Sequence, residues 1–419
     1  MFIQIICFLL FIFSLYYLFN QKSKISEPQK PKENKKKQKS RNSPDNQKIE
    51  TKKEEEEKKE VIKEPNKEVI KEPNKEDITK YLIKTVKEGN NISKIYFYKN
   101  GHIILFCDEK KISLCLIKNF DFKENPKTCS KTIEKDLIVD ICLSPEKKAI
   151  FCANKNSKSI LYYTLEKIES KLKIIKQEKT IQCERPYEIK SIVCDNAGTL
   201  ICTIGTNDDT EIQIFEPTSA ELKFKQSTSA IQNLQMRMSP NDSDLLISTF
   251  MNDISVLNFE KSDKFNPESK KYENVYKFKR SSSIPVKARP LFYTLSNNEK
   301  FFAVSCDDKS VKIFRIYGNI SESKIYAQIN LENNTNVCYL FVDDFQNGKL
   351  EGYLAIESGN DILIYDINCN IYKELNDAHD SDIVGLYLTK EDNKDNTDKN
   401  KDLILISAGK EGRIKFWKI

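Results

Sequence analysis

The sequence predicts an all-β domain over residues 80–419, preceded by an apolar segment and a charged linker. Two observations support this prediction. From residue 80 onward, short apolar runs of alternating polarity are separated by polar turns, with no helical periodicity between them, which is typical of closely spaced β-strands. These runs also group into seven repeats with a period of about 47 residues, as expected when one supersecondary unit is stacked many times.

Residues 1–19 (MFIQIICFLLFIFSLYYLF) contain no charged side chain. A helix of this length would measure about 28 Å, which is close to the hydrocarbon thickness of about 30 Å in a bilayer. No basic residue precedes the apolar run and no small-residue cleavage motif precedes Asn20, so a retained anchor is favoured over the alternative of a cleaved signal peptide. We therefore expect a single-pass transmembrane anchor at residues 1–19.

The charges that follow the apolar run set its expected orientation. Residues 22–41 hold nine Lys/Arg and two Glu, and basic flanks stay on the cytosolic side of a membrane. The short apolar run suits a thin bilayer such as that of the endoplasmic reticulum. We therefore expect a protein of the endoplasmic reticulum membrane whose repeat domain faces the cytosol. Four N-x-S/T sequons would instead suggest a lumenal domain, but such sequons arise by chance in a chain this rich in Asn.

Residues 20–79 are dense in Lys, Glu, Pro and Asn and nearly devoid of aromatic residues. Such a segment buries too little apolar surface to offset its ordering entropy, so we expect a disordered, charged linker. It contains the octamer EVIKEPNK twice, at residues 60–67 and 68–75. We interpret the duplication as part of a spacer; a docking motif used twice is the alternative.

Charge and cysteine usage argue against several classes of function. Residues 20–79 carry 18 Lys/Arg and 14 Asp/Glu, which leaves 50 and 48 for the rest of a chain whose net charge is +6. Nucleic-acid binding is therefore not expected, since such domains usually carry a basic excess. The 12 Cys form no C-x-x-C pair and only two His are present, so we expect no metal site and no cofactor.

The last repeat has the most regular pattern. DAHDSDIVGLYLT is followed by a polar insertion and by DLILISAGKEGRIKFWKI, which contains the single Trp of the chain, Trp417. A polar turn with His leads to an alternating strand, then to a second strand ending in small residues, an acidic turn and a third strand closed by Trp. The same template with weaker residues recurs at residues 91–119, 136–166, 187–216, 231–260, 288–316 and 335–367.

This order of elements resembles a blade of the WD-repeat proteins, and the resemblance covers residues 80–419. It implies a seven-bladed WD-repeat β-propeller, a blade number within the usual range. An anchor, a Lys-rich linker and a divergent propeller together are similar to the layout of the transducin beta-like protein 2 family. The most similar local segment is RMSPNDSDLLISTFMNDISVLNFEKSDKFNPESKKYENVYKFK. That resemblance implies an endoplasmic-reticulum scaffold linked to the stress-activated kinase that phosphorylates a translation initiation factor.

The WD-repeat resemblance also implies a hydrogen-bonded chain that locks the strands of the last repeat together. Its members would be His379, Ser407, Glu411 and Trp417. Glu411 stands where the family prefers Asp, which leaves its reach open. We interpret His379 as structural and not as a catalytic base, because no nucleophile or second carboxylate recurs near it in the pattern.

Earlier repeats keep parts of this set. The acid of the turn is retained by Asp209 and Asp308. The place of Trp417 is taken by Phe215, Phe259, Phe314 and Tyr365. Most of these repeats lack the His, so we expect them to be degenerate blades.

The last repeat supplies three strands, whereas a blade of a WD-repeat propeller has four. We expect the fourth strand from residues 79–89 (TKYLIKTVKEG), just before the first repeat. The two ends of the domain would then pair and leave no open edge. On this interpretation Trp417 belongs to the closure of the domain and not to a binding site.

The expected function is that of a non-enzymatic, membrane-tethered scaffold that presents its propeller to protein partners. The sequence has no phosphate-binding Gly loop, metal-ligand spacing or nucleophile motif, so we expect no catalytic residue and no small-molecule substrate. By resemblance, the partner would be an endoplasmic-reticulum stress kinase. The alternative is a membrane-bound propeller that acts as a nucleotide-exchange factor for a small GTPase of vesicle-coat assembly.

Overall fold

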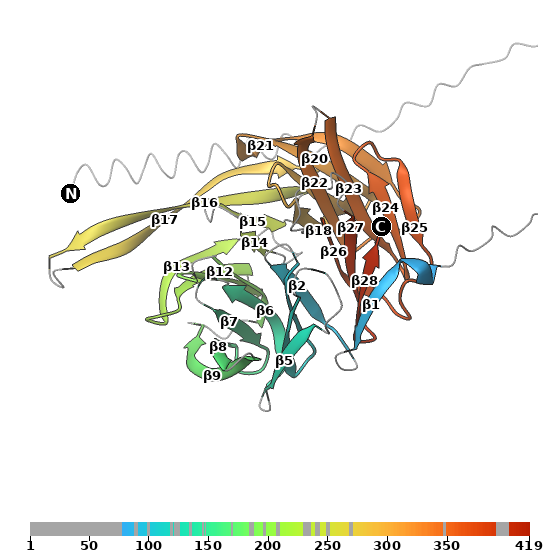
Figure 1. Cartoon of the computed structure of the whole chain (residues 1–419). Helices are drawn as coiled ribbons and strands as arrows, with labels where there is room; N and C mark the ends of the chain where they lie inside the picture. Colours follow the sequence, from blue (N-terminus) through green and yellow to red (C-terminus); the bar gives the residue numbers. More distant parts are fainter. Residues whose placement is uncertain are drawn as a thin grey trace, which may run out of the picture. The chain divides into compact units, whose positions relative to one another are not determined.

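The computed structural model describes residues 78–419 with short gaps (Figure 1). The gaps are residues 88–90, 99–100, 118–119, 121–125, 134–135, 145, 147, 169–170, 184–187, 196–197, 207–209, 229–235, 239–243, 249–251, 268–270, 347–348 and 391–401. The chain divides into two units, residues 1–70 and 71–419, and every described residue belongs to the second. The expected anchor at residues 1–19 and nearly all of the expected linker lie outside the described residues. Within the described part, no helix is long and apolar enough to cross a membrane.

The described residues form seven four-stranded antiparallel sheets, which we call blades 1–7. Blade 1 consists of β2 (Lys94–Tyr98), β3 (Ile103–Cys107), β4 (Lys111–Leu116) and β5 (Lys127–Thr132). Blade 2 consists of β6 (Ile138–Ser144), β7 (Ala149–Asn154), β8 (Ser159–Ile168) and β9 (Lys171–Gln182). Blade 3 consists of β10 (Glu188–Cys194), β11 (Ile201–Thr206), β12 (Thr210–Glu216) and β13 (Glu221–Thr228). Blades 4 and 5 consist of β14 (Met236–Met238), β15 (Asp244–Ser248), β16 (Asp253–Asn266) and β17 (Lys271–Pro285); and β18 (Pro290–Leu295), β19 (Phe301–Cys306), β20 (Ser310–Tyr317) and β21 (Asn319–Asn330).

Blades 6 and 7 consist of β22 (Cys338–Gln346), β23 (Lys349–Ser358), β24 (Asp361–Asp366) and β25 (Ile371–Leu375); and β26 (Ile383–Lys390), β27 (Leu403–Gly409), β28 (Arg413–Lys418) and β1 (Leu82–Lys87). A short 3-10 turn, η1 (Ile78–Tyr81), precedes β1. The all-β prediction is confirmed, and seven such sheets are consistent with a seven-bladed β-propeller.

The first strands of the blades contact one another in chain order. β2 contacts β6, β6 contacts β10, β10 contacts β14, β18 contacts β22 and β22 contacts β26, while blades 4 and 5 meet through β15 and β18. The series returns to its start, because β26 of blade 7 contacts β2 of blade 1. Such a closed series of first strands is what a propeller requires.

Burial explains the continuous apolar runs in the second strands of the blades. Every residue of β7 (AIFCAN), β19 (FFAVSC) and β27 (LILISAG) is buried. Phe301 of β19 belongs to the same apolar cluster as Leu340 of β22 in the next blade. By contrast, the outer strand β5 (KTCSKT) is mostly exposed. The core therefore lies between neighbouring blades, and a second strand has no solvent face on which polar residues would alternate with apolar ones.

Blade 7 is assembled from two distant parts of the chain. Its strand order is β1-β28-β27-β26, so β1 takes the outer position beside β28 (Figure 1, blue beside red). The antiparallel register pairs Leu82 with Trp417 and Lys87 with Arg413. The segment before the first repeat thus supplies the outer strand of the last one, at the place where the sequence analysis put it.

Two glycines permit the close approach of blades 7 and 1. A Cβ added at Gly385 of β26 would lie 2.2 Å from Ile95 Cγ2 of β2, so a side chain there would force the two first strands apart. Gly101, in the turn after β2, has φ +83 and lies against Tyr387 of β26. A backbone hydrogen bond from Ile92 N to Lys410 O, 3.3 Å long, adds to this contact.

β16 and β17 form a long hairpin in blade 4. Their register runs without interruption from Leu257↔Arg280 to Asn266↔Lys271, and in Figure 1 the pair extends far beyond β14 and β15 (yellow).

A β-bulge recurs between the third and fourth strands of six blades. On the third strand it falls directly before Trp417 in blade 7, and directly before Phe215, Phe314 and Tyr365 in blades 3, 5 and 6. In blade 4 it falls between Val256 and Leu257. The backbone register therefore puts Leu257 in the place of Trp417, and the prediction of Phe259 for that place is wrong by two positions.

Candidate functional site

The four residues expected to form a chain in the last repeat lie within hydrogen-bonding distance of one another. Trp417 Nε1 is 2.8 Å from Ser407 Oγ. Ser407 Oγ is 2.7 Å from His379 Nε2, and His379 Nδ1 is 2.5 Å from Glu411 Oε1. Trp417 and Ser407 belong to β28 and β27, Glu411 to the turn between these strands, and His379 to the loop before β26. The chain therefore ties that loop to the two strands.

The chemistry of the groups fixes the direction of these hydrogen bonds. The indole N–H of Trp417 can only donate, so the Ser407 oxygen accepts from it. The Glu411 carboxylate can only accept, so His379 Nδ1 holds a proton, and in a neutral imidazole the unprotonated Nε2 accepts the hydroxyl proton of Ser407. A neutral imidazole of this kind carries its proton on Nδ1 and donates it to Glu411. The arrangement therefore specifies one tautomer of His379.

The pKa values of the pair agree with this tautomer. Burial lowers the pKa of His379 below its usual value of 6.5, although the Glu411 carboxylate acts in the opposite direction. Burial alone would raise the pKa of Glu411, but hydrogen bonds from Ser381 and His379 outweigh it and lower that pKa below the usual 4.5. The site is thus built for a neutral His beside an ionised Glu.

Glu411 reaches His379 because a glycine stands two positions before it. A Cβ at Gly409 would lie 1.9 Å from Glu411 Oε2, far inside contact distance. The carboxylate folds back over this open position, where the same oxygen, Oε2, accepts a hydrogen bond from Ser381 Oγ. Glu in place of Asp therefore keeps the contact with the imidazole.

The position of the hydrogen-bonded chain of His379, Ser407, Glu411 and Trp417 suits a structural role. His379 is 2% exposed, and both of its ring nitrogens have partners within the chain. A general base must reach a proton on a bound substrate, and a buried imidazole whose nitrogens are both engaged is not placed to do so. The other His of the protein, His102, precedes β3, where its Nδ1 is 3.2 Å from Ile117 O.

Of the two turn acids, Asp209 lies outside the described residues. Asp308 lies in the turn between β19 and β20, where its Oδ1 is 3.2 Å from Ser310 N and its Oδ2 is 2.9 Å from Lys312 Nζ. Lys312 is 3% exposed. Asp308 therefore stabilises its own turn and supplies the counter-charge for a buried ammonium group.

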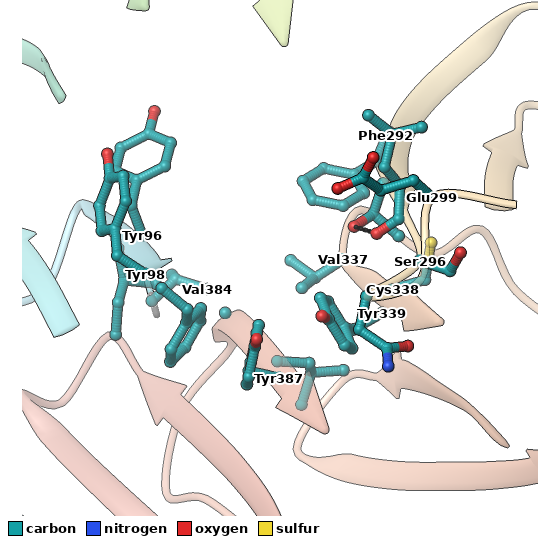
Figure 2. Close-up of a pocket in the computed structure, with 17 residues that line it drawn as sticks. Tyr96, Tyr98, Phe292, Ser296, Glu299, Val337, Cys338, Tyr339, Val384 and Tyr387 are labelled. Carbon is teal, nitrogen blue, oxygen red and sulfur yellow. Dashed lines mark hydrogen bonds between the residues drawn. The ribbon is translucent and has the colours of Figure 1, made fainter. Parts of the chain in front are cut away.

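A pocket of about 420 Å³ opens where the first strands of blades 1, 5, 6 and 7 converge (Figure 2). β2 contributes Tyr96, Phe97 and Tyr98 to its walls. Figure 2 shows Tyr96 and Tyr98 on one side and Phe292 of β18 on the other. The pocket is thus a shared product of four blades, and aromatic rings form much of its surface.

The floor of this pocket is a stack of rings from three blades. Phe97 and Tyr387 stack with centroids 5.0 Å apart, and Tyr387 contacts Tyr339 of β22 at 4.3 Å. Burial raises the pKa of both tyrosines above the usual value of 10, so they are uncharged at neutral pH. The floor is therefore uncharged and held in place by packing between blades.

Glu299 gives the pocket its charge. It lies in the exposed turn after β18 with φ +61, and in Figure 2 its carboxylate points toward the space between Phe292 and the tyrosines of β2. Burial raises the pKa of Glu299. Among the described lining residues it carries the single carboxylate, and none of them is Lys, Arg or His.

A second polar network lies among the first strands of blades 1, 2 and 3, and its centre is Asp140 of β6. Asp140 is 1% exposed, and Oδ1 accepts hydrogen bonds from Tyr96 Oη at 2.5 Å and from Ile141 N at 2.9 Å. Oδ2 accepts from Ser191 Oγ and Ile192 N of β10, each at 3.0 Å. One buried carboxylate therefore connects three successive blades and positions the Tyr96 side of the pocket.

Sequence reasoning missed both the pocket and Asp140. A signal was present in the repeats, since the first strands of blades 1, 5, 6 and 7 read KIYFY, PLFYTL, CYLFVDDFQ and IVGLYLTK, with aromatic residues in each. The first strands of blades 2 and 3 read IVDICLS and EIKSIVC and have none. An alignment of the repeats on their first strands would have shown which blades place aromatic residues at the pocket.

Among the described residues, five of the six exposed large apolar side chains lie on the bulged outer strands of blades 5, 6 and 7, and the sixth, Tyr317, ends β20. The bulges leave Tyr326, Tyr372 and Ile83 without a paired residue on the third strand. Their exposed fractions are 40%, 50% and 37%. Because equivalent positions in three neighbouring blades carry exposed apolar side chains, the rim of these blades is a second candidate surface.

The described part of the chain shows no metal site, and comparison with known proteins gives no match. The described residues include no group of three or more His, Cys, Asp or Glu arranged to hold a metal ion. A scan against protein-family models gives no match, and a search of the curated proteins finds no relative of this chain.

Proposed function

We propose that this protein is a non-enzymatic scaffold that binds other proteins through the centre of its seven-bladed domain. The observation that carries the proposal is the central pocket, which four blades build from aromatic residues of their first strands. Pockets lined mainly by apolar and aromatic side chains, with a few polar groups, are typical of binding sites. His379 and Glu411 of the last blade are engaged in a structural hydrogen-bonded chain and are not among the described lining residues of the pocket, where Glu299 carries the single carboxylate.

The finer classification as a WD-repeat protein belongs to the same proposal. The order of loop His, strand Ser, turn acid and strand Trp in blade 7, together with the hydrogen bonds that join them, supports it. The likeness to the transducin beta-like protein 2 family rests on the layout of anchor, linker and repeats in the sequence. By that likeness, the partner would be an endoplasmic-reticulum stress kinase.

We further propose that residues 1–19 tether the domain to the endoplasmic reticulum membrane with the blades in the cytosol. The support is the uncharged apolar run and the excess of Lys/Arg in residues 22–41. A glycosidase-sensitive shift in the electrophoretic mobility of the protein from cells would place the domain in the lumen and contradict this part of the proposal.

Proximity labelling in cells tests the binding function. The full chain is compared with a form lacking residues 1–19 and with the pocket variant Phe292→Leu. A matched control is Tyr317→Leu, which changes an exposed aromatic residue outside the pocket, 47% exposed. We expect a set of labelled proteins that the pocket variant loses and the control retains. If both variants label the same proteins as the unchanged chain, the pocket is not the binding site.

The nucleotide-exchange alternative has a direct test. The full chain is added to a small GTPase of vesicle-coat assembly loaded with a fluorescent nucleotide, and nucleotide release is followed. The scaffold proposal expects the rate of release to stay at its intrinsic value. A clear acceleration would show an activity beyond binding and overturn the proposal that the protein is non-enzymatic.

A further inference from the structure

We propose that the central pocket binds the ammonium group of a lysine side chain, free or methylated, on a partner protein. This inference rests on the proposed binding function and names the chemical group that enters the pocket. It is carried by the combination of aromatic rings on several sides of one space with a single carboxylate at its edge.

The rings supply the first part of the argument. The face of an aromatic ring carries partial negative charge and attracts a cation within about 6 Å of its centre. Tyr96 and Tyr98 stand on one side of the pocket and Phe292 on the other, with Tyr339 and Tyr387 below them (Figure 2). The space is therefore bordered by rings from blades 1, 5, 6 and 7.

The charge supplies the second part. Glu299 directs its carboxylate into the same space (Figure 2), and no Lys, Arg or His is present among the described lining residues to balance it. Burial already disfavours the charged form of this side chain, since it raises the pKa of Glu299. An incoming ammonium group would form an ion pair with the Glu299 carboxylate, whereas an anion would be repelled by it and a neutral ligand would leave its charge uncompensated.

The size of the pocket agrees with a lysine side chain. Its volume of about 420 Å³ is within the range of ligand pockets. The four-carbon stem of lysine is apolar and packs well against aromatic rings while its charged end reaches inward. The rings that form the floor are fixed by packing between blades, so the ligand does not have to order them.

The test uses small probes on the full chain, purified in a maltoside detergent that carries no ammonium group. Isothermal titration calorimetry compares choline and n-butylammonium with 3,3-dimethylbutan-1-ol, the uncharged isostere of choline. We expect at least one of the cations to bind about tenfold more tightly than the neutral isostere. Tighter binding of choline would indicate a methylated lysine, and tighter binding of n-butylammonium an unmodified one.

Three pocket variants and two control variants outside the pocket locate the binding. Phe292→Leu and Glu299→Gln should each weaken binding of the cation by roughly three- to tenfold. Phe292→Tyr keeps the ring and should retain binding, which guards against loss of folding as the cause. Tyr317→Leu and Glu322→Gln change an aromatic and an acidic residue outside the pocket lining, and both should bind like the unchanged chain.

Equal affinity for choline and its neutral isostere would overturn the inference, as would the absence of measurable binding by either cation. So would equal weakening by the pocket variants and the two controls. These outcomes are distinct from a failure of the proposed function: a chain that binds no cation but loses its labelled partners on Phe292→Leu still has a binding pocket, of different chemistry.

Discussion

The hydrogen-bonded chain around His379 and the network around Asp140 are both buried and polar, but they connect different things. The His379 chain joins a loop and two strands within blade 7. The Asp140 network joins the first strands of blades 1, 2 and 3 through Tyr96, Asp140 and Ser191. The first therefore fixes the inside of one sheet, whereas the second fixes the position of one sheet relative to its neighbours.

This difference also affects what each network leaves for function. The members of the His379 chain lie away from the pocket lining, so blade 7 can be stabilised without shaping the pocket. Asp140 holds Tyr96, which is a pocket wall. The Asp140 network thus couples the stability of the ring to the geometry of the candidate binding site.

The largest effect should come from removing a strand of blade 7. Deleting residues 412–419 removes β28, which pairs with both β27 and β1, and we expect the melting temperature of the domain to fall by at least about 10 °C. Deleting residues 80–89 removes β1 alone, so the fall should be smaller. Differential scanning calorimetry measures both, and an unchanged melting temperature in either form would contradict the closure of the blade.

Replacing Asp140 should have the next largest effect. Asp140→Ala leaves the hydroxyls of Tyr96 and Ser191 and two backbone N–H groups without their buried acceptor, and we expect a loss of about 3 kcal/mol or more in the free energy of unfolding. The matched control is Asp382→Ala, whose ion pair with Lys410 is exposed and should contribute less than about 1 kcal/mol.

The same Asp140 variant sharpens the comparison between the two networks. At a temperature where it remains folded, Asp140→Ala should weaken cation binding in the pocket because Tyr96 loses its anchor. Ser407→Ala in the His379 chain should destabilise the protein and leave the affinity of folded protein for the probe unchanged. Equal probe affinities in the two variants would show that Asp140 has no influence on the pocket.

The His379 chain should make stability depend on pH. The pKa of His379 in the folded protein is lowered from 6.5. The unfolded state therefore binds more protons than the folded state below pH 6.5, and the folded state loses stability there. Glu411, whose pKa is also lowered, acts in the same direction nearer its usual 4.5. Between pH 6.5 and 5.5 we expect a decrease of up to about 1.4 kcal/mol per pH unit.

Thermal unfolding across this pH range measures the slope. His379→Gln removes the titrating group and should flatten it. His102→Gln, at the other His of the protein, keeps His379 and should retain the slope of the unchanged chain. A slope that persists in His379→Gln would mean that another group causes the pH dependence.

The smallest effect concerns the contact between Gly409 and Glu411. Gly409→Ala places a Cβ where the Glu411 carboxylate lies, so we expect a loss of roughly 1–2 kcal/mol in stability. In the Glu411→Asp background the shorter side chain vacates this space and the same substitution should be less harmful. Urea unfolding of the four proteins gives the coupling energy, about 1 kcal/mol, and additive effects would contradict the contact.

The sequence was sufficient for features that a short segment encodes. The residues of the His379 chain fall in one repeat, and the alternating and continuous apolar runs show where the strands lie. The missing strand of blade 7 was accessible because a count of strands left one repeat incomplete. In these cases hydrogen bonding or burial constrains residues that lie close together in the sequence, so the constraint is visible as a local pattern.

The pocket and the Asp140 network were not predicted because each is assembled from residues of several different repeats. Asp140 occurs in VDIC as an isolated acid in an apolar run, with no local partner to explain it. Its partners Tyr96 and Ser191 come from other repeats, 44 and 51 positions away. The register of the first strands around the centre decides these contacts, and small bulges in that register, as before Phe292 and Gly385, are not visible in composition or periodicity.

The pairing of β1 with β28 has a consequence for how the protein is made. Leu82 pairs with Trp417, so a ribosome working at about 5–20 residues per second needs roughly 20–60 s to deliver the partner strand after β1 has been synthesised. During that interval six blades have all their strands and can form, while β1 waits as a single strand with unpaired backbone groups. Its sequence, LIKTVK, places two lysines among its apolar residues, and charges of this kind keep an exposed strand from pairing with other chains. Synthesis of blade 7 then recruits the waiting strand and completes the domain.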